Sequence, residues 1–128
     1  MAQQKTKKKV LVVDDEPDVA ELCRQALESE DIEVVTAFDG LSAESEIRSL
    51  KPDLVVLDVM MPMYDGFELC RKLKANPETE DIQVVLFTAA PEDFIVERIL
   101  ETGADDYILK PIDALGMEAK IRDMLGLS

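Results

Sequence analysis

The sequence predicts an α/β fold, a doubly wound parallel sheet of five strands flanked by five helices. The first observation is that predicted strands and helices alternate along the chain. Five short apolar runs are each followed by a segment whose apolar residues recur with the period of a helix. The second is residues 54–57, four consecutive apolar residues with no polar alternation, which is typical of a strand buried on both faces. Helices between successive strands imply right-handed crossovers and therefore helices on both faces of the sheet.

The first half of the chain supplies two strand–helix units. A β-branched run at residues 10–13 predicts the first strand, and the period of the apolar residues predicts a helix over residues 16–29. Residues 33–37 are predicted as the second strand, which Asp39-Gly40 ends. The helix expected near residues 41–50 has few apolar residues and is the weakest of the five.

The second half supplies the other three units. The buried strand at residues 54–57 leads into Asp58, and a helix follows Asp65-Gly66 and ends at Asn76-Pro77. The remaining segments follow the same alternation: a strand at 82–87, a helix at 92–101, a strand at 106–109 and a helix at 113–125.

Composition indicates one soluble globular domain with an acidic surface. The chain has 128 residues, of which 47% are hydrophobic and 33% charged, with 14 Lys and Arg against 28 Asp and Glu. Residues 1–9 contain four lysines and no acid, and we expect them to form a disordered basic leader. The remaining chain is strongly acidic, so we expect no direct nucleic-acid binding and no membrane binding.

The same composition excludes several kinds of site. The chain has no His and no paired Cys motif, which disfavours tetrahedral zinc and Ser-His catalysis. Cys23 and Cys70 stand alone in helical patterns and are expected to be reduced core residues. The absence of an apolar membrane span and of a signal peptide predicts a cytoplasmic protein.

Reactive side chains stand at the predicted ends of four strands. Asp14 and Asp15 follow the first strand, Asp58 the third, Thr88 the fourth and Lys110 the fifth. The carboxyl ends of parallel strands share one edge of the sheet, where ligands bind, so these residues should converge. Clustered carboxylates repel one another unless a divalent cation is present, and oxygen ligands favour Mg²⁺. A nucleophilic carboxylate beside a lysine and a hydroxyl predicts phosphoryl transfer to Asp58.

Each of these residues also has an ordinary structural explanation. Asp14 and Asp15 suit a helix cap, Asp58 a turn or cap, Thr88 a strand end, and Lys110 a solvated surface. Their joint placement at one predicted edge favours the reactive site.

Ordered motifs recur at these strand ends: residues 10–17 (VLVVDDEP), 52–62 (PDLVVLDVMMP), 65–66 (DG), 88–90 (TAA) and 103–111 (GADDYILKP). With them the chain resembles the receiver domain of two-component response regulators, of the single-domain chemotaxis-regulator type. The resemblance places the domain at residues 10–126 and implies the flavodoxin-like strand order 2-1-3-4-5.

The resemblance also implies roles for individual residues. Asp58 would be the phosphoacceptor, with Mg²⁺ held by Asp14, Asp15, Asp58 and the backbone carbonyl of Met60. Lys110 would contact the phosphoryl group, and its peptide bond to Pro111 would be cis. Thr88 and Tyr107 would form the switch pair that responds to phosphorylation.

The resemblance also implies a partner face formed by the fourth helix, fifth strand and fifth helix. The fourth helix has more apolar residues than one buried stripe needs, so part of it should remain exposed. The residues assigned to this face are Phe94, Ile95, Val96 and Tyr107. The competing interpretation is a wide stripe that is fully buried.

One departure from the family pattern and one feature of the expected phosphoryl site stand out. Glu44 occupies a position that is usually apolar, which puts the packing of the weak second helix in doubt. Met60 and Ala90 flank the phosphoryl position and neither side chain can polarise water, which predicts slow hydrolysis of the acyl phosphate.

The predicted function is a phosphorylation-activated switch and not a turnover enzyme. The expected partners are a sensor histidine kinase or phosphotransfer protein as donor, and a downstream protein or a second copy of the chain on the partner face. A magnesium-dependent phosphatase with an aspartyl nucleophile is the alternative, but such enzymes usually have a second acid where this chain has Met60. A pseudo-receiver that only binds partners is disfavoured because every reactive position is filled.

Overall fold

The computed structural model describes residues 6–127. Five strands alternate with five helices, as predicted, and these elements lie at β1 (Lys8–Val13), α1 (Pro17–Leu27), β2 (Ile32–Ala37), α2 (Gly40–Leu50), β3 (Leu54–Asp58), α3 (Gly66–Ala75), β4 (Gln83–Thr88), α4 (Glu92–Thr102), β5 (Asp106–Leu109) and α5 (Ala114–Met124). None of the helices in the described part of the chain has the length and apolar character needed to cross a membrane.

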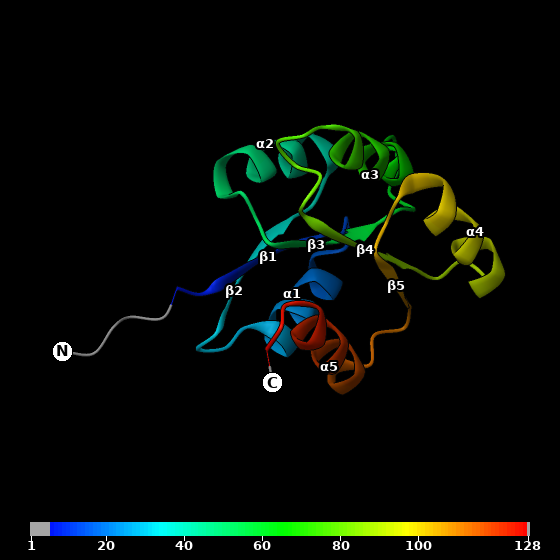
Figure 1. The fold of residues 1–128 in the computed structure, drawn as a ribbon. Coiled ribbons are helices and arrows are strands. Elements are labelled where there is room, and N and C mark those ends of the chain that lie inside the picture. Colours follow the sequence, from blue (N-terminus) through cyan, green and yellow to red (C-terminus); the bar gives the residue numbers. More distant parts are fainter. Residues whose placement is uncertain (1–5, 128) are drawn as a thin grey trace.

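The strands form one parallel sheet in the order β2-β1-β3-β4-β5, which confirms the predicted flavodoxin-like order. Helices α1 and α5 cover one face, and α2, α3 and α4 cover the other (Figure 1). The sheet therefore separates two apolar clusters, one under each helical layer. Reversal of the strand order between β1 and β3 leaves a crevice at their carboxyl ends, which is where such sheets bind ligands.

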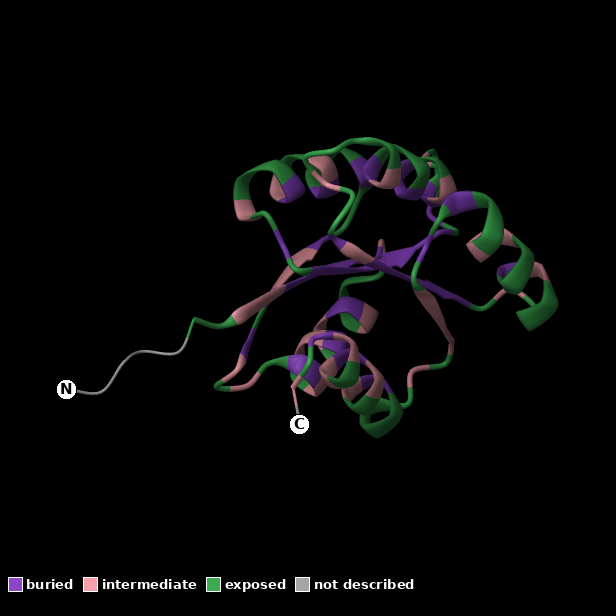
Figure 2. Cartoon of the chain, viewed as in Figure 1, coloured by how far each residue is buried: buried purple, intermediate pink, exposed green. Residues whose placement is uncertain are grey.

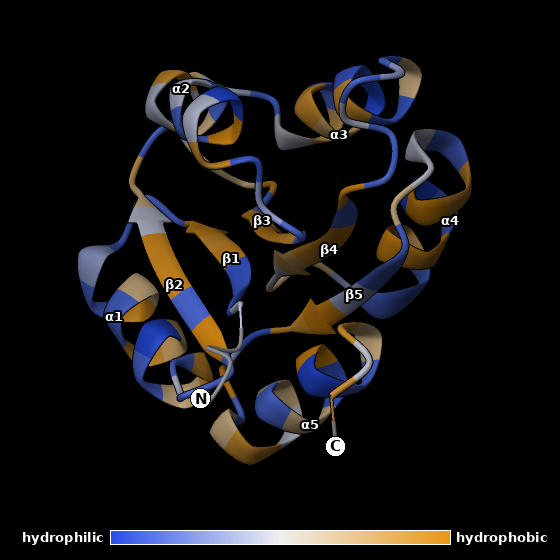
Figure 3. Ribbon diagram, turned by 60° about the vertical axis from the view of Figure 1, so that its left-hand side comes forward, coloured by the Kyte–Doolittle hydropathy of each residue, from blue (hydrophilic) through white to orange (hydrophobic). Residues whose placement is uncertain are grey.

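The three inner strands are the most buried part of the chain (Figure 2). Every residue of β3 is buried, in agreement with its unbroken apolar run. The edge strands β2 and β5 are only partly buried. Hydrophobic colour covers much of the sheet, whereas the helices carry both colours (Figure 3). The core is thus organised around β1, β3 and β4.

The predicted boundaries hold to within a few residues, with one correction at the start. Strand β1 begins at Lys8, so Lys8 and Lys9 belong to the sheet and not to the predicted leader of residues 1–9. The Lys9 N–H donates to Asp53 Oδ2 at 2.8 Å, and the aliphatic stems of lysines can lie along a sheet while their amines stay solvated. The first five residues of the leader lie outside the described part.

Cys23 and Cys70 are free, buried thiols, as predicted for reduced core residues. Burial raises the pKa of Cys23 to about 12, so this thiol stays protonated and unreactive at neutral pH.

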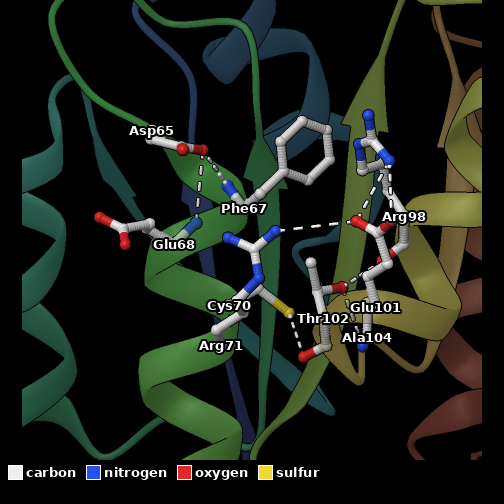
Figure 4. A network of polar contacts seen from close by, with 9 residues as sticks. All are labelled: Asp65, Phe67, Glu68, Cys70, Arg71, Arg98, Glu101, Thr102 and Ala104. Carbon is white, nitrogen blue, oxygen red and sulfur yellow. Dashed lines mark hydrogen bonds and ion pairs between the residues drawn. The ribbon is translucent and has the colours of Figure 1, made fainter.

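Helix α4 contacts α3 through a network of polar side chains (Figure 4). Arg98 pairs with Glu101 at 3.1 Å, and Arg71 of α3 approaches the same carboxylate at 3.8 Å. Beneath these ion pairs the Cys70 thiol lies 3.7 Å from the Thr102 carbonyl oxygen. The position of α4 therefore depends on α3, which begins beside the predicted reactive edge.

Met63 is a strained residue in the loop between β3 and α3. Its φ of 59° lies in the left-handed region, and its side chain is fully exposed. We expect Met63→Gly to raise the free energy of unfolding by about 0.5–1 kcal/mol, because relief of strain exceeds the added entropy of the unfolded chain. Urea denaturation measures the change. Met63→Ala keeps the β-carbon, so an equal gain in that variant would show that strain is not the cause.

Candidate functional site

The carboxyl ends of β1, β3 and β5 bring three charged side chains into contact. Lys110 Nζ lies 2.9 Å from Asp14 Oδ2 and 3.4 Å from Asp58 Oδ2. The backbone fixes this arrangement, because the Asp14 N–H donates to the Ala37 carbonyl at 3.0 Å and the Lys110 N–H to the Thr88 carbonyl at 2.8 Å. The predicted convergence of Asp14, Asp58 and Lys110 is therefore present.

Asp58 is almost completely buried, with 2% of its surface exposed. Its Oδ1 accepts a hydrogen bond from the Met60 N–H at 2.9 Å, and its Oδ2 faces Lys110. Burial raises the pKa of Asp58 above its ordinary value and Asp14 adds to this, while the Met60 N–H and Lys110 lower it. The Met60 N–H and Lys110 hold the carboxylate in place, but they do not fully offset the effect of burial and of Asp14 on its pKa.

Lys110 remains a cation in this setting. Burial alone would lower the pKa of its amine, but Asp14 and Asp58 raise it above the ordinary value. The ammonium also lies 5.0 Å from the centroid of the Phe87 ring, within cation–π range. The Lys110–Pro111 peptide bond is cis, as the resemblance implies.

Three consecutive acids lie beside this contact. One carboxylate oxygen from each of Asp14, Asp15 and Glu16 falls within 4.8 Å of the others. The capping interpretation does not hold for Asp14 and Asp15, because Glu16 is the N-cap of α1 and α1 begins without a side-chain cap bond. Asp14 instead accepts the Glu16 N–H at 2.9 Å and is fully buried.

A pocket of about 450 Å³ opens over these groups. Its lining consists of residues from the loops after four strands: Asp15, Glu16, Asp58, Met60, Pro62, Ala89, Ala90 and Lys110. A larger pocket of about 970 Å³ lies at the opposite edge of the sheet, lined by strand-start residues such as Lys8 and Gln83. We assign the chemistry to the smaller pocket because Asp58 and Lys110 line it, whereas neither lines the larger pocket.

Residues 10–122 match the model of the family described as the response regulator receiver domain. This chain belongs to that family. The phosphate regulon transcriptional regulatory protein PhoB of Rhizobium meliloti is 42% identical over 117 residues, which are 91% of this chain and 52% of the relative. The DNA-binding response regulator MtrA of Mycolicibacterium smegmatis is 37% identical over 119 residues, 93% of this chain and 51% of the relative. This receiver domain thus spans about half the length of these relatives.

Solved structures support the same assignment. The signal receiver domain of a DNA-binding response regulator from Colwellia psychrerythraea superimposes with a TM-score of 0.87 at 30% identity, covering 94% of this chain and 99% of that one. Membership of the family makes this chain a signalling protein whose state depends on phosphorylation.

The acidic end of the pocket fits a magnesium ion. Asp14 is fully buried, and the charged partner of its Oδ2 is the Lys110 ammonium at 2.9 Å. Asp15 and Glu16 add exposed carboxylates beside it, and Mg²⁺ prefers oxygen ligands of this kind. The ligand set expected from the sequence did not include Glu16, although its place in a run of three acids was a usable signal.

Thr88 and Tyr107 lie near the pocket but do not line it. Thr88 is fully buried, and its Oγ1 accepts the Ala90 N–H at 3.1 Å. The Tyr107 hydroxyl donates to Glu92 of α4 at 2.5 Å. The described arrangement therefore brings Asp14, Asp58 and Lys110 together but leaves the predicted switch pair outside their contact.

Helix α4 exposes apolar surface, which rules out the fully buried stripe. Val96 is 43% exposed and Leu100 83% exposed, whereas Phe94 is partly covered by the Phe67 ring at 6.1 Å between centroids. Ile95 is a correction to the predicted partner face, because it is completely buried. It lies on the side of α4 that packs on the sheet, so it contributes to the core.

Proposed function

We propose that this receiver domain accepts a phosphoryl group on Asp58 from the phosphohistidine of a sensor kinase or phosphotransfer protein. A carboxylate oxygen of Asp58 would form the new bond to phosphorus while the bond between phosphorus and the histidine nitrogen breaks. The observation that carries the proposal is a buried carboxylate fixed by the Met60 N–H at 2.9 Å and faced by Lys110 at the floor of an open pocket.

Other residues of the pocket have assigned roles in this proposal. Lys110 would leave Asp14 to contact phosphoryl oxygens, since its ammonium already lies between both carboxylates. Asp14, Asp15, Asp58 and the Met60 carbonyl would hold Mg²⁺, with Glu16 near enough to join them. Bound Mg²⁺ would offset the charge of the carboxylates and of the incoming phosphoryl oxygens.

The proposed output is a change at the face formed by α4, β5 and α5. Thr88 would turn toward the phosphoryl group, and Tyr107 would exchange its bond to Glu92 for a position nearer Thr88. This would alter the surface around Phe94 and Val96, where a downstream protein or a second copy of the chain binds. The cytoplasmic location stays a prediction.

The expectation that the protein avoids nucleic acid is not supported. It rested on the acidic charge of this chain, but the longer relatives, of which this chain matches about half, are named as a transcriptional regulatory protein and as a DNA-binding response regulator. Acidic charge disfavours DNA contact by the receiver domain alone and does not extend to the activity of a longer protein.

We expect one phosphoryl adduct by intact-mass analysis after incubation with acetyl phosphate and Mg²⁺, and none after Asp58→Asn. Omission of Mg²⁺ should also abolish the adduct.

Removal of acetyl phosphate should leave an adduct that decays slowly, because the side chains of Met60 and Ala90 cannot activate water. A folded chain that binds Mg²⁺ but takes no adduct would instead be a pseudo-receiver, and steady phosphate release from small esters would indicate a phosphatase.

A further inference from the structure

The loop between β3 and α3 carries Met60 next to the acceptor. Val59 and Met61 are buried in the core, whereas Pro62 and Met63 are exposed. Tyr64 is therefore the next side chain after Met61 that packs against the apolar core. Its contacts decide where the second half of the loop lies.

Tyr64 packs on the first turn of α2. A β-carbon on Gly40 would lie 2.0 Å from Tyr64 Cδ2, so the ring occupies the space that any larger residue at position 40 would need. The Tyr64 hydroxyl donates to Glu44 Oε2 at 2.7 Å, and Lys72 Nζ lies 3.3 Å from Glu44 Oε1. The hydrogen bond from Tyr64 is the main reason that the pKa of Glu44 is lowered, which keeps this acceptor ionised.

The loop is also held closely where α3 begins. A β-carbon on Gly66 would lie 2.8 Å from Val59 Cα and 3.0 Å from the Asp58 carbonyl oxygen. The start of α3 thus rests against the backbone of the acceptor, and the Met60 N–H is bonded to the acceptor itself. Because the backbone is closely packed at this end, a displacement of Tyr64 must change the conformation of the few residues between Met61 and Gly66 or move the backbone of Met60.

We propose that Tyr64 is a positioning residue, which holds the β3–α3 loop through Gly40 and Glu44 of α2 and so fixes the Met60 backbone in the phosphoryl pocket. The inference rests on the proposed function, because it concerns the backbone expected to hold Mg²⁺. It also explains Glu44, whose carboxylate accepts a hydrogen bond from the loop at a position of α2 where the family usually has an apolar residue.

Two variants separate the hydroxyl from the ring. Tyr64→Phe removes the bond to Glu44 and keeps the ring, whereas Gly40→Ala displaces the ring and keeps every polar group. We expect each to weaken Mg²⁺ binding about tenfold, as other residues that orient metal ligands do, measured by isothermal titration calorimetry. The initial phosphorylation rate by acetyl phosphate should fall at low Mg²⁺ and recover at saturating Mg²⁺.

The matched control is Thr79→Val, which removes a hydrogen bond of 2.7 Å from Thr79 Oγ1 to the Leu73 carbonyl at the far end of α3. It should lower the free energy of unfolding in urea without changing Mg²⁺ affinity. In a Tyr64→Leu background, Gly40→Ala should have little further effect on Mg²⁺ binding, because the aromatic ring that it displaces is gone.

Folded Tyr64→Phe and Gly40→Ala variants that bind Mg²⁺ as tightly as the parent would overturn the inference and leave Tyr64 with a structural role only. The proposed function would survive that result. A parent chain that binds no Mg²⁺ and takes no adduct would overturn both.

Discussion

Lys110→Met is expected to lower the rate of Asp58 phosphorylation by about 100-fold, the scale of losing one donor that stabilises developing charge. Methionine has an unbranched apolar side chain but lacks the ammonium, which lies 3.4 Å from Asp58 and 5.0 Å from the centroid of the Phe87 ring. The same change removes the cation 2.9 Å from Asp14, so the affinity for Mg²⁺ should rise while phosphorylation falls. Phosphorylation rates from intact mass and Mg²⁺ titration by calorimetry give the two measurements.

The control for this variant is Lys120→Met. Lys120 pairs with Asp106 at 3.1 Å on the α5 side of the molecule and does not line the pocket. Both its phosphorylation rate and its Mg²⁺ affinity should match those of the parent. If Lys110→Met kept the parent's rate, Lys110 would only neutralise the two carboxylates and would have no part in the transfer.

Phe87→Ala is expected to lower the free energy of unfolding by about 3–5 kcal/mol. Phe87 is fully buried at the centre of the sheet, on the face covered by α1 and α5, and alanine would leave a cavity there. A domain of this size has only about 5–15 kcal/mol of stability, so the variant should unfold at much lower urea concentration. Urea denaturation followed by far-ultraviolet circular dichroism measures the midpoint.

Phe38→Ala is the matched comparison, because Phe38 is 46% exposed and lies outside both apolar clusters. We expect a loss below about 1 kcal/mol there. Equal losses at Phe38 and Phe87 would contradict the assignment of the core to the inner strands.

Prediction from sequence succeeded where the signal is local. The apolar run before Asp58 predicted a strand buried along its whole length, and the same reasoning located the ends of β1, β4 and β5 within two residues. Ile95 shows where local reasoning failed, because a count of apolar residues on α4 does not say which of them the sheet covers.

The sequence by itself determined the fold class and the edge of the sheet where Asp14, Asp58 and Lys110 gather, and it indicated Asp58 as the carboxylate that we propose as the acceptor. Apolar periodicity and strand ends depend on neighbouring residues, which a sequence records directly. Only the tertiary structure decided that Lys110 pairs with Asp14 as well as Asp58, and that Tyr64 reaches Glu44 across 20 residues of sequence. Such distances depend on how separate crossovers pack on the sheet, and no local pattern specifies them.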